Sequence, residues 1–575
     1  MRWKYVPVEE ERKKSLSREL GVSAHMAEVL ARLDIERIED LRAFLSPKLR
    51  DLGDPFALPN LKEAAQRIIR ARDAGERVVV FGDYDVDGVT STTLLVSVFR
   101  GIGLRPDFIV PRRMEEGYGL SAAAVERVVA ECRPDLLLAV DCGTNSQTEV
   151  KALRERGIDV IIVDHHRAGE GICEDCLIVN PHLETGETRP WTDLSAVGLA
   201  FKLAHGLLKC LRESGDSKGW DIELKDYLDL AALGTIADLV PLREENRILA
   251  WHGLKALNGA RGQGLRALVQ VAGLKENAPI RPVDIAFRLG PRINACGRLA
   301  DATLPVRMFL SEDFGFCLET ANQLDAYNRE RQDIERRIVA EADERIEVMD
   351  DDFSGMVLYD DEWHPGVVGI VASRLSRKYN RPAIVLGREG DLAKGSGRGI
   401  PGLNLVRVLE RCDDLLDSWG GHPLAVGVAL PRRNLEEFQE RFSRTVGDLF
   451  DGEIPLPEID LAAWIDLDDI GEVFLGELDR LHPFGQGNPE PLFGVRKVQL
   501  RASPRVFQDA HYRFQVESRR GRRFFGVAWK KADSLPPLNT PLDFIFRIYR
   551  NLYNGREYLQ LELIDWRPSR NSEAE

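Results

Sequence analysis

Three short apolar runs in the first half of the chain are each followed closely by an aspartate. The runs occupy residues 78–81, 136–140 and 160–163, and the aspartates after them are Asp83, Asp141 and Asp164. Helical periodicity separates the runs, and this alternation is typical of βα units that build a parallel sheet. Ligands of such sheets bind beyond the carboxyl ends of the strands. The sequence therefore predicts an α/β domain in which acidic side chains converge at one edge of the sheet.

The first of these strand ends carries a cluster of carboxylates. In the segment GDYDVDG, the alternate spacing of Asp85 and Asp87 lets both side chains project together from an extended strand end. Carboxylates packed this closely repel one another, so divalent cations are their natural counter-charge. His165 and His166 follow the third run, and a mixture of carboxylate and imidazole favours manganese or magnesium over zinc. Two such ions about 3.5–4 Å apart would activate a water for phosphodiester hydrolysis.

Other interpretations of these residues need weighing. Residues 83–88 satisfy the first half of a calcium-loop pattern, but Leu94 stands where that pattern needs an acidic ligand. Asp141 taken alone is compatible with an ordinary helix N-cap. Cys173 and Cys176 are spaced like half of a zinc site, or are two buried thiols, and no second pair matches them.

Composition sets the class of protein. A chain of 575 residues is too long for one core and suggests three or four domains. No apolar run approaches the roughly 20 residues that cross a bilayer, and the N-terminus lacks a signal-peptide stretch, so we expect a cytoplasmic protein with no membrane association. Eight cysteines fit reduced thiols in that compartment. The net charge of −15 argues against a nucleic-acid partner unless the charge is unevenly distributed.

The pattern of elements predicts five parts. Residues 318–347 contain no Gly or Pro, which predicts one long helix. The sequence after Pro455 has the pattern of β-hairpins and predicts a small barrel. We therefore predict a multidomain α/β protein with an N-terminal helical segment of unknown role (1–58), a parallel-sheet catalytic domain (59–312), a connector helix (313–350), a smaller α/β substrate-binding domain (351–450) and an OB-type β-barrel that binds nucleic acid (451–575).

The motifs resemble a known superfamily. GDYDVDG, AVDCG, VDHH and ALGTIADLVPL match, in order, the four catalytic motifs of the DHH phosphoesterases. The later segments GPRINACGRL, WHPGVVGIVASRL, GSGRGI, GGHPLAVG and PFGQGNPEP are similar to the RecJ branch, and the resemblance runs from about Leu61 into the C-terminal region. It implies a DHH domain, a DHH-associated domain and an exonuclease that degrades single-stranded DNA from 5′ to 3′ into 5′-mononucleotides by two-metal-ion catalysis, in DNA repair and recombination.

The resemblance also implies a ligand set. Its metal ligands are Asp85, Asp87, Asp141, His165 and Asp238, and the cofactors are two divalent cations, Mn²⁺ or Mg²⁺. Asp141 would bridge both ions, while Asp83 and His166 would support the site or contact the scissile phosphate. Several superfamily members carry a histidine earlier in the first motif; Phe81 stands there in this chain, so that ligand is excluded.

Two further regions are predicted to hold the substrate. Ser396 and Arg398, in GSGRG, offer donors suited to phosphate, although a surface turn is the alternative. We assign these two, with Arg113, Arg292 and His422, to DNA phosphates. Residues 501–530 hold eight basic and two acidic side chains. Tyr512, Phe514, Phe524, Phe525 and Trp529 are interleaved with these charges. Half of these must be core, so we expect only one or two to stack on bases.

Two other functions compete with this one. A DHH hydrolase of short oligonucleotides, cyclic dinucleotides or pyrophosphate would need only the two α/β domains, so the barrel favours a longer strand. A DNA-binding scaffold without catalysis would be expected to lose ligands, yet every metal position is present. The expected partner is single-stranded DNA, with a helicase and a single-strand-binding protein compatible because duplex must first be opened.

Overall fold

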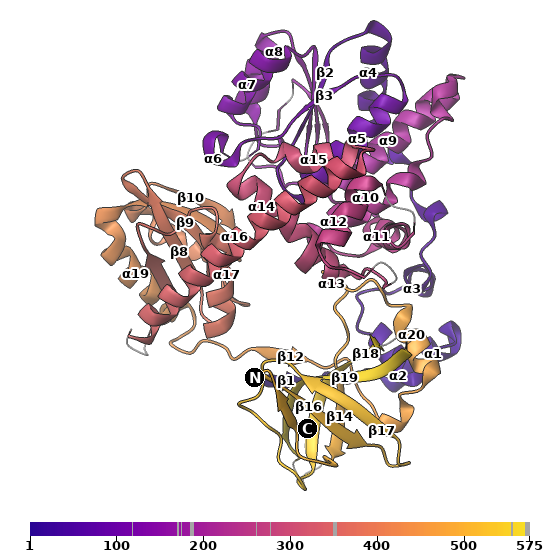
Figure 1. Ribbon diagram of the computed structural model, residues 1–575, viewed down its shortest axis with the longest axis vertical. Helices are drawn as coiled ribbons and strands as arrows, with labels where there is room; N and C mark the ends of the chain where they lie inside the picture. The colour runs from indigo at the N-terminus through magenta and orange to yellow at the C-terminus, as the bar shows by residue number, and fades with distance from the viewer. Residues whose placement is uncertain are drawn as a thin grey trace. The chain divides into compact units, whose positions relative to one another are not determined.

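The chain folds into two compact units, each built from segments far apart in sequence (Figure 1). The first unit comprises residues 1–52, 241–251 and 458–575, and the second comprises residues 53–240 and 252–457. The computed structural model describes residues 1–117, 119–169, 172–173, 175–183, 189–259, 262–275, 278–348, 353–553 and 556–569. The division into two units does not test the boundaries that the sequence predicts for five domains.

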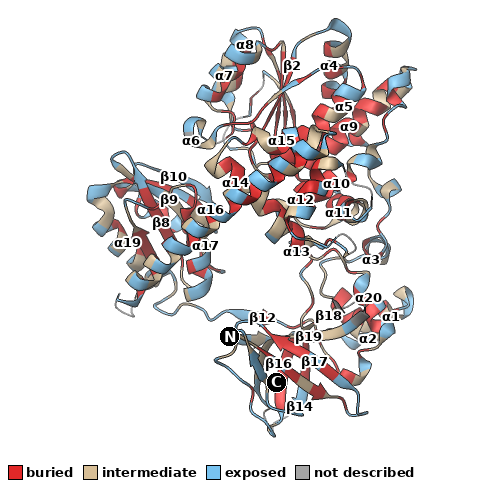
Figure 2. Ribbon diagram, viewed as in Figure 1, coloured by how far each residue is buried: buried red, intermediate tan, exposed pale blue. Residues whose placement is uncertain are grey.

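The second unit contains the predicted parallel sheet. Its five strands lie in the order β3-β2-β4-β5-β6, and every neighbouring pair is parallel. The strands are β2 (Val78–Gly82), β3 (Asp107–Ile109), β4 (Leu136–Val140), β5 (Asp159–Val163) and β6 (Leu177–Val179). Figure 1 shows helices on both sides of this sheet, and Figure 2 shows its strands buried between them. A sheet covered on both faces needs apolar strands throughout, as the sequence has.

Strand register brings the three aspartates to one edge. Gly82 pairs with Val140, and Val140 pairs with Val163, so each aspartate is the residue that follows a matched strand end. Because the chain places β3 and β4 on opposite sides of β2, the order of the strands reverses beside β2, where open α/β sheets bind their ligands. The predicted convergence of acidic side chains is confirmed by this arrangement.

Helices complete the catalytic part of this unit. The helices beside the sheet are α4 (Leu61–Ala74), α5 (Val86–Gly101), α7 (Ala122–Cys132), α8 (Gln147–Glu155) and α9 (Ala196–Glu213). Those that follow are α10 (Leu228–Ala237), α12 (Gln263–Val271), α13 (Pro282–Asp284), α14 (Gly290–Leu299) and α15 (Thr303–Leu310). The long predicted helix is confirmed as α16 (Phe314–Glu347). Within the described part of the chain, no helix is long and apolar enough to cross a membrane.

A smaller α/β part follows α16 in the same unit. Its mixed sheet has the order β10-β11-β9-β8-β7, in which only β7 and β8 run parallel. Its strands are β7 (Met356–Tyr359), β8 (Ala383–Glu389), β9 (Leu392–Arg398), β10 (Ser418–His422) and β11 (Ala425–Pro431). Its main helices are α17 (Val368–Tyr379) and α19 (Leu435–Leu449). Separate apolar clusters on the two faces hold α17 and α19 against the sheet.

The first unit is built around a seven-stranded sheet in the order β13-β14-β18-β19-β17-β16-β15. Its strands are β13 (Ala463–Trp464), β14 (Phe493–Val498), β15 (Arg505–Phe507), β16 (His511–Glu517), β17 (Arg523–Ala528), β18 (Leu542–Tyr553) and β19 (Arg556–Pro568). An isolated bridge between Leu500 and Val516 joins the chain beyond β14 to β16, which curls the sheet toward a barrel. This fold agrees with the predicted OB type.

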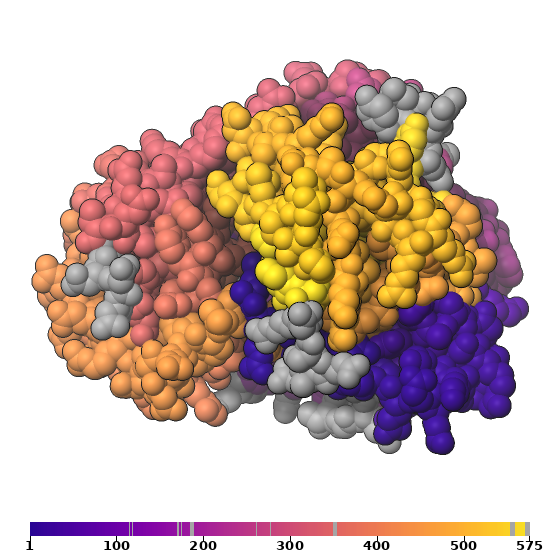
Figure 3. Space-filling model, turned by 90° about the horizontal axis from the view of Figure 1, so that it is seen from below, coloured from indigo at the N-terminus to yellow at the C-terminus, as the bar shows by residue number. Residues whose placement is uncertain are grey.

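The N-terminal segment, whose role the sequence left open, belongs to the barrel. Its helices are α1 (Glu10–Leu20), α2 (Ala24–Leu30) and α3 (Ile38–Leu45). Leu16, Met26 and Phe44 share one apolar core with the barrel residues Phe474 and Phe493. In addition, β1 (Arg2–Lys4) pairs in parallel with β12 (Glu458–Asp460), and Figure 3 shows the indigo N-terminal segment against the orange and yellow barrel. The N-terminal helices therefore cover barrel surface that would otherwise be exposed.

Candidate metal centre

The first motif forms a tight turn between β2 and α5. Asp85 is the N-cap of α5, and its Oδ1 accepts hydrogen bonds from the backbone N–H groups of Asp87 (2.9 Å) and Gly88 (3.1 Å). A Cβ on Gly88 would lie only 2.4 Å from the carbonyl oxygen of Asp83, so glycine alone fits there. This close approach sets the carboxylates of Asp83 and Asp85 beside each other.

Asp87 is held by a second helix. It is fully buried, and its two carboxylate oxygens accept hydrogen bonds from the N–H groups of Ala196 (2.7 Å) and Val197 (2.8 Å) at the start of α9. The first N–H groups of a helix have no partner within the helix and favour negative charge. A carboxylate accepts about four hydrogen bonds or ligand bonds, so these two contacts orient Asp87 and leave capacity for a cation.

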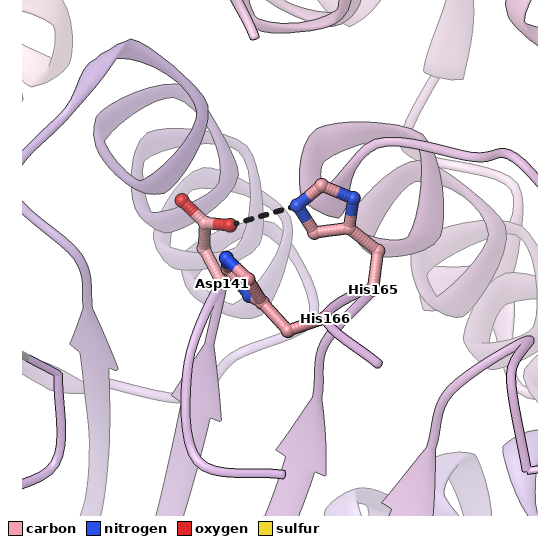
Figure 4. A group of neighbouring side chains, drawn as sticks. All are labelled: Asp141, His165 and His166. Carbon is pink, nitrogen blue, oxygen red and sulfur yellow. Dashed lines mark ion pairs between the residues drawn. The ribbon is translucent and has the colours of Figure 1, made fainter. Parts of the chain in front are cut away.

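His165 links the second and fourth motifs. Its Nε2 lies 3.4 Å from Oδ1 of Asp141 (Figure 4). The same Nε2 lies 3.6 Å from Oδ2 of Asp238, which is the C-cap residue of α10. Asp141 has a φ of 62°, a left-handed conformation that costs energy for a residue other than glycine. Such strain is common where a side chain must be aimed at a functional site.

Asp164 positions the two histidines rather than joining the cluster itself. Its Oδ1 accepts from the backbone N–H of His165 (2.8 Å) and lies 2.7 Å from Nδ1 of His166. Burial would raise the pKa of Asp164, but the contact with His166 lowers it below its usual range. Burial would lower the pKa of His166, but Asp164 raises it to about 9. At neutral pH the pair is therefore ionic and His166 is protonated.

The predicted site residues form three overlapping groups. Within each group, the candidate ligand atoms lie within 4.8 Å of one another. The groups are Asp83, Asp85 and Asp141; Asp87, His165 and Asp238; and Asp141, His165 and His166. All seven residues predicted for catalysis thus meet in one place. Asp83, for which the resemblance implies only a supporting role, belongs to one of these candidate metal groups.

The buried carboxylates of the cluster repel one another. Burial and neighbouring carboxylates raise the pKa values of Asp83, Asp87 and Asp141 well above the usual range. In the part of the chain that the structure describes, Oδ1 of Asp83 is buried without a hydrogen-bond partner. An orphaned oxygen among repelling carboxylates and an imidazole fits Mn²⁺ or Mg²⁺. No group of this kind among the described residues includes Cys173 or Cys176, which are free thiols.

Two arginines lie near Tyr84 of the first motif. The guanidinium of Arg113 lies 5.0 Å from the centre of the Tyr84 ring. Burial and the nearby Arg113 lower the pKa of Arg298 to about 10, and Arg298 donates to the carbonyl of Gly366 (2.6 Å). Arg292, which we predicted to contact phosphate, forms an ion pair with Asp325 (2.8 Å), and its phosphate contact stays a prediction.

Arg298 was not among the phosphate contacts that the sequence predicted, whereas Arg292 on the same helix was. The two lie six residues apart on α14 and so point to different faces of that helix. Both stand in the segment PRINACGR, and only the packing of α14 shows which of them faces Tyr84 and the loop before α17.

The donors of the smaller sheet share one face. Ser396 and Arg398 are alternate residues of β9, and a Cβ on Gly369 in α17 would lie 3.2 Å from Ser396 Oγ and 3.7 Å from Arg398 Nη2. Arg398 pairs with Ala425 and Ala425 pairs with His422, so the exposed His422 belongs to the same row. Directly paired residues point to the same face of a sheet, so all three predicted donors lie on the α17 side.

The aromatic residues of the barrel divide as expected between core and surface. Tyr512, Phe514 and Phe524 are buried, whereas Phe525 and Trp529 are 62% and 45% exposed. Trp529 lies in a ring cluster that the sequence did not single out, because its centroid is 5.9 Å from that of Phe507 and 5.0 Å from that of His511. The guanidinium of Arg513 lies 4.9 Å from the Phe507 ring.

Comparisons with known proteins match both α/β parts and the barrel. Family models match residues 77–235 (DHH family, N-terminal domain), 352–448 (DHHA1 domain) and 459–565 (RecJ OB domain). The single-stranded-DNA-specific exonuclease RecJ of Bacillus subtilis is 38% identical over 87% of this chain, which spans 62% of that relative's length. RecJ of Escherichia coli is 34% identical over 92% of this chain and 98% of the relative.

A solved structure shows the same fold. The crystal structure of RecJ from Thermus thermophilus in complex with Mn²⁺ matches with a TM-score of 0.83 and 28% identity, covering 99% of this chain and 80% of that one. The Mg²⁺ complex of the same protein matches with a TM-score of 0.77. The sequence relatives and the shared fold establish the family, and the ordered cluster at the sheet edge agrees with it. The chain belongs to the RecJ family of DHH phosphoesterases.

Proposed function

We propose that this chain hydrolyses single-stranded DNA from the 5′ end to 5′-mononucleotides with two divalent cations, and serves DNA repair and recombination. The observation that carries the proposal is the set of overlapping ligand groups at the carboxyl edge of the parallel sheet. Asp141 of one group lies 3.4 Å from His165 of another, so the two groups are neighbours. Two neighbouring cations require two such adjacent sets of ligands.

The residues divide between the two cations. Asp83, Asp85 and Asp141 would hold one ion, and Asp87, His165 and Asp238 would hold the other. When bound, the cations supply Lewis acidity that lowers the pKa of a water and neutralises developing phosphate charge. Asp141, which lies 3.4 Å from His165, is the residue placed to bridge the two positions.

His166 has a different role. Asp164 keeps it protonated, so it is suited to donate a hydrogen bond to a non-bridging phosphate oxygen rather than to bind metal.

Four donors suited to the 5′ phosphate belong to the same compact unit as the metal groups. Arg113 lies against the ring of Tyr84 in the first motif, and Arg298 on α14 is close enough to Arg113 and Arg398 for both to lower its pKa. Ser396 and Arg398 stand on β9 of the smaller sheet. Burial lowers the pKa values of Arg298 and Arg398, which shows that these cations lie partly out of water, where attraction to phosphate is stronger. Donors for a terminal phosphate beside the metal groups would let the enzyme begin only at a 5′ end.

The variant Arg398→Ala tests this arrangement. We expect it to raise KM for a 5′-phosphorylated strand by about tenfold or more, because a charge-assisted hydrogen bond is worth about 1.5–3 kcal/mol. A strand with a 5′ hydroxyl should be affected much less. The control is Arg388→Ala, an exposed arginine at the end of β8. Equal losses on both strands would contradict the assignment.

The polarity itself is tested with end-labelled strands in Mn²⁺. We expect immediate release of the 5′ label as mononucleotide, survival of the 3′ label in progressively shorter strands, and resistance of a blunt duplex. Failure on long strands with turnover of dinucleotides would instead place the chain with DHH hydrolases of small substrates.

The barrel is proposed to bind the strand beyond the active site. Aromatic platforms with nearby arginines are typical of surfaces that bind single strands. We expect Trp529→Ala to weaken binding of a long strand about tenfold, since one stacked base is worth about 1–3 kcal/mol, and to leave cleavage of very short strands unchanged. Fluorescence anisotropy measures the binding, with the exposed Trp220→Ala as control. Equal weakening in the control would remove the barrel surface from the proposal.

Deletion of the barrel is not a clean test. The N-terminal helices share its apolar core, so truncation after Pro455 would expose Leu16, Met26 and Phe44 to water.

A further inference from the structure

Two exposed apolar side chains flank the metal centre. Leu239 directly follows the ligand Asp238 and is 64% exposed, and Phe287, between α13 and α14, is 72% exposed. Neither belongs to the metal groups or to the phosphate donors. Single exposed apolar side chains are ordinary on protein surfaces, so the backbone conformation and position of these two decide whether they have a function.

Leu239 occupies a strained backbone conformation. Its φ is 64°, in the left-handed region where the Cβ of an ordinary residue crowds the carbonyl oxygen. Asn or Gly would adopt this conformation at lower cost. An apolar side chain kept at such a position, without burial in a core, points to a function for that side chain.

Phe287 lies in a single π-helical turn, Ile285–Leu289. Turns of this kind are rare and are found frequently at functional sites. The segment is well anchored, because Arg288 donates to the carbonyl of Ala272 (2.6 Å) and Asp284 accepts from the N–H of Arg281 (3.1 Å). The exposure of the phenyl ring is therefore a property of an ordered element.

The π-helical turn reaches the segments that carry the ligands. It packs against α10 and leads directly into Gly290. A Cβ on Gly290 would lie 3.6 Å from Cγ2 of Val86, the residue after Asp85, and 3.7 Å from Cβ of Ala237, the residue before Asp238. Phe287, three residues before Gly290, is thus within about one helical turn of the segments that carry Asp85 and Asp238.

We propose that Leu239 and Phe287 form an apolar lip that contacts the nucleobases of the strand lying in the metal centre. This inference rests on the proposed function. Carboxylates, cations and arginines of the site engage phosphates and carry no affinity for base faces, whereas an aromatic ring and an aliphatic side chain match the apolar faces of all bases. Such contacts would hold the scissile nucleotide without selecting a sequence.

Abasic substrates test the lip. Initial rates are measured in Mn²⁺ on a 5′-phosphorylated single strand and on the same strand with abasic residues at its 5′ end. We expect Phe287→Ala and Leu239→Asn each to lower kcat/KM on the normal strand about tenfold, and to change it little on the abasic strand. The unfolding midpoint should stay the same for Phe287→Ala and stay the same or rise for Leu239→Asn, because asparagine tolerates the left-handed conformation.

Two control variants match the chemistry of the changes elsewhere in the same unit. Trp220→Ala removes an aromatic side chain that is 71% exposed, and Arg133→Asn places asparagine at another position with positive φ (47°). Both should behave as the unaltered protein on both strands. Unchanged rates in the lip variants, or equal losses on normal and abasic strands, would overturn the inference. If the unaltered protein fails to hydrolyse the normal strand, the proposed function fails instead.

Discussion

Replacing Asp141 with asparagine is expected to reduce hydrolysis of single-stranded DNA by about a thousandfold or more. Asp141 belongs to two of the three ligand groups and lies 3.4 Å from His165, so its loss disturbs both cation positions at once. Lewis-acid stabilisation of phosphoryl transfer is worth several kcal/mol, and each 1.36 kcal/mol changes the rate tenfold. The measurement is release of a 5′-labelled mononucleotide under a Mn²⁺ titration.

The same variant should leave the fold intact and stabilise it without metal. Burial raises the pKa of Asp141 in the folded protein, so its ionised form opposes folding at neutral pH. Asparagine removes that cost, so the metal-free variant should unfold at a higher temperature at neutral pH, and the difference should shrink as acid protonates the aspartate. Added Mn²⁺ should stabilise the unaltered protein more than the variant.

An exposed aspartate supplies the control for Asp141. Asp107→Asn, in the edge strand β3, should change neither the rate nor the effect of Mn²⁺ on unfolding. Substantial Mn²⁺-dependent activity in Asp141→Asn would exclude the bridging role.

Arg247→Met is expected to lower the free energy of unfolding of the first unit by about 3–5 kcal/mol. The Arg247 side chain is buried and lies 3.6 Å from the centre of the Phe44 ring. Its guanidinium donates to the carbonyls of Phe44, Arg480, Leu481 and His482. Burial lowers the pKa of Arg247 to about 9. Methionine keeps much of the volume but leaves those carbonyls without their donor.

Urea unfolding combined with limited proteolysis measures this effect. Cleavage should appear at lower urea within residues 1–52 and 458–575, while the second unit keeps its resistance. Arg12→Met is the matched control, because Arg12 is exposed and reaches a single carbonyl at 3.5 Å. A midpoint for Arg247→Met equal to that of Arg12→Met would mean that the four carbonyls find other donors at no cost.

Local sequence was sufficient for much of the active site. The apolar runs predicted β2, β4 and β5 because buried parallel strands need continuous apolar side chains, and the aspartates at their ends converge because parallel strands end at one edge. The run without Gly or Pro at residues 318–347 predicted α16, and the hairpin pattern after Pro455 predicted the barrel. Asp238 was found only through family resemblance, because it ends a buried helix rather than a strand.

The sequence by itself determined which elements form and which chemical groups stand at their ends, because periodicity and strand termini are properties of neighbouring residues. Tertiary structure alone decided which residues meet across the chain. It brought Asp83 into a candidate metal group, brought Arg298 near Tyr84, paired Arg292 with Asp325, left Trp529 at the barrel surface and packed the N-terminal helices on the barrel. These outcomes depend on helix phase, strand order and the burial of apolar surface between segments hundreds of residues apart, which no local pattern records.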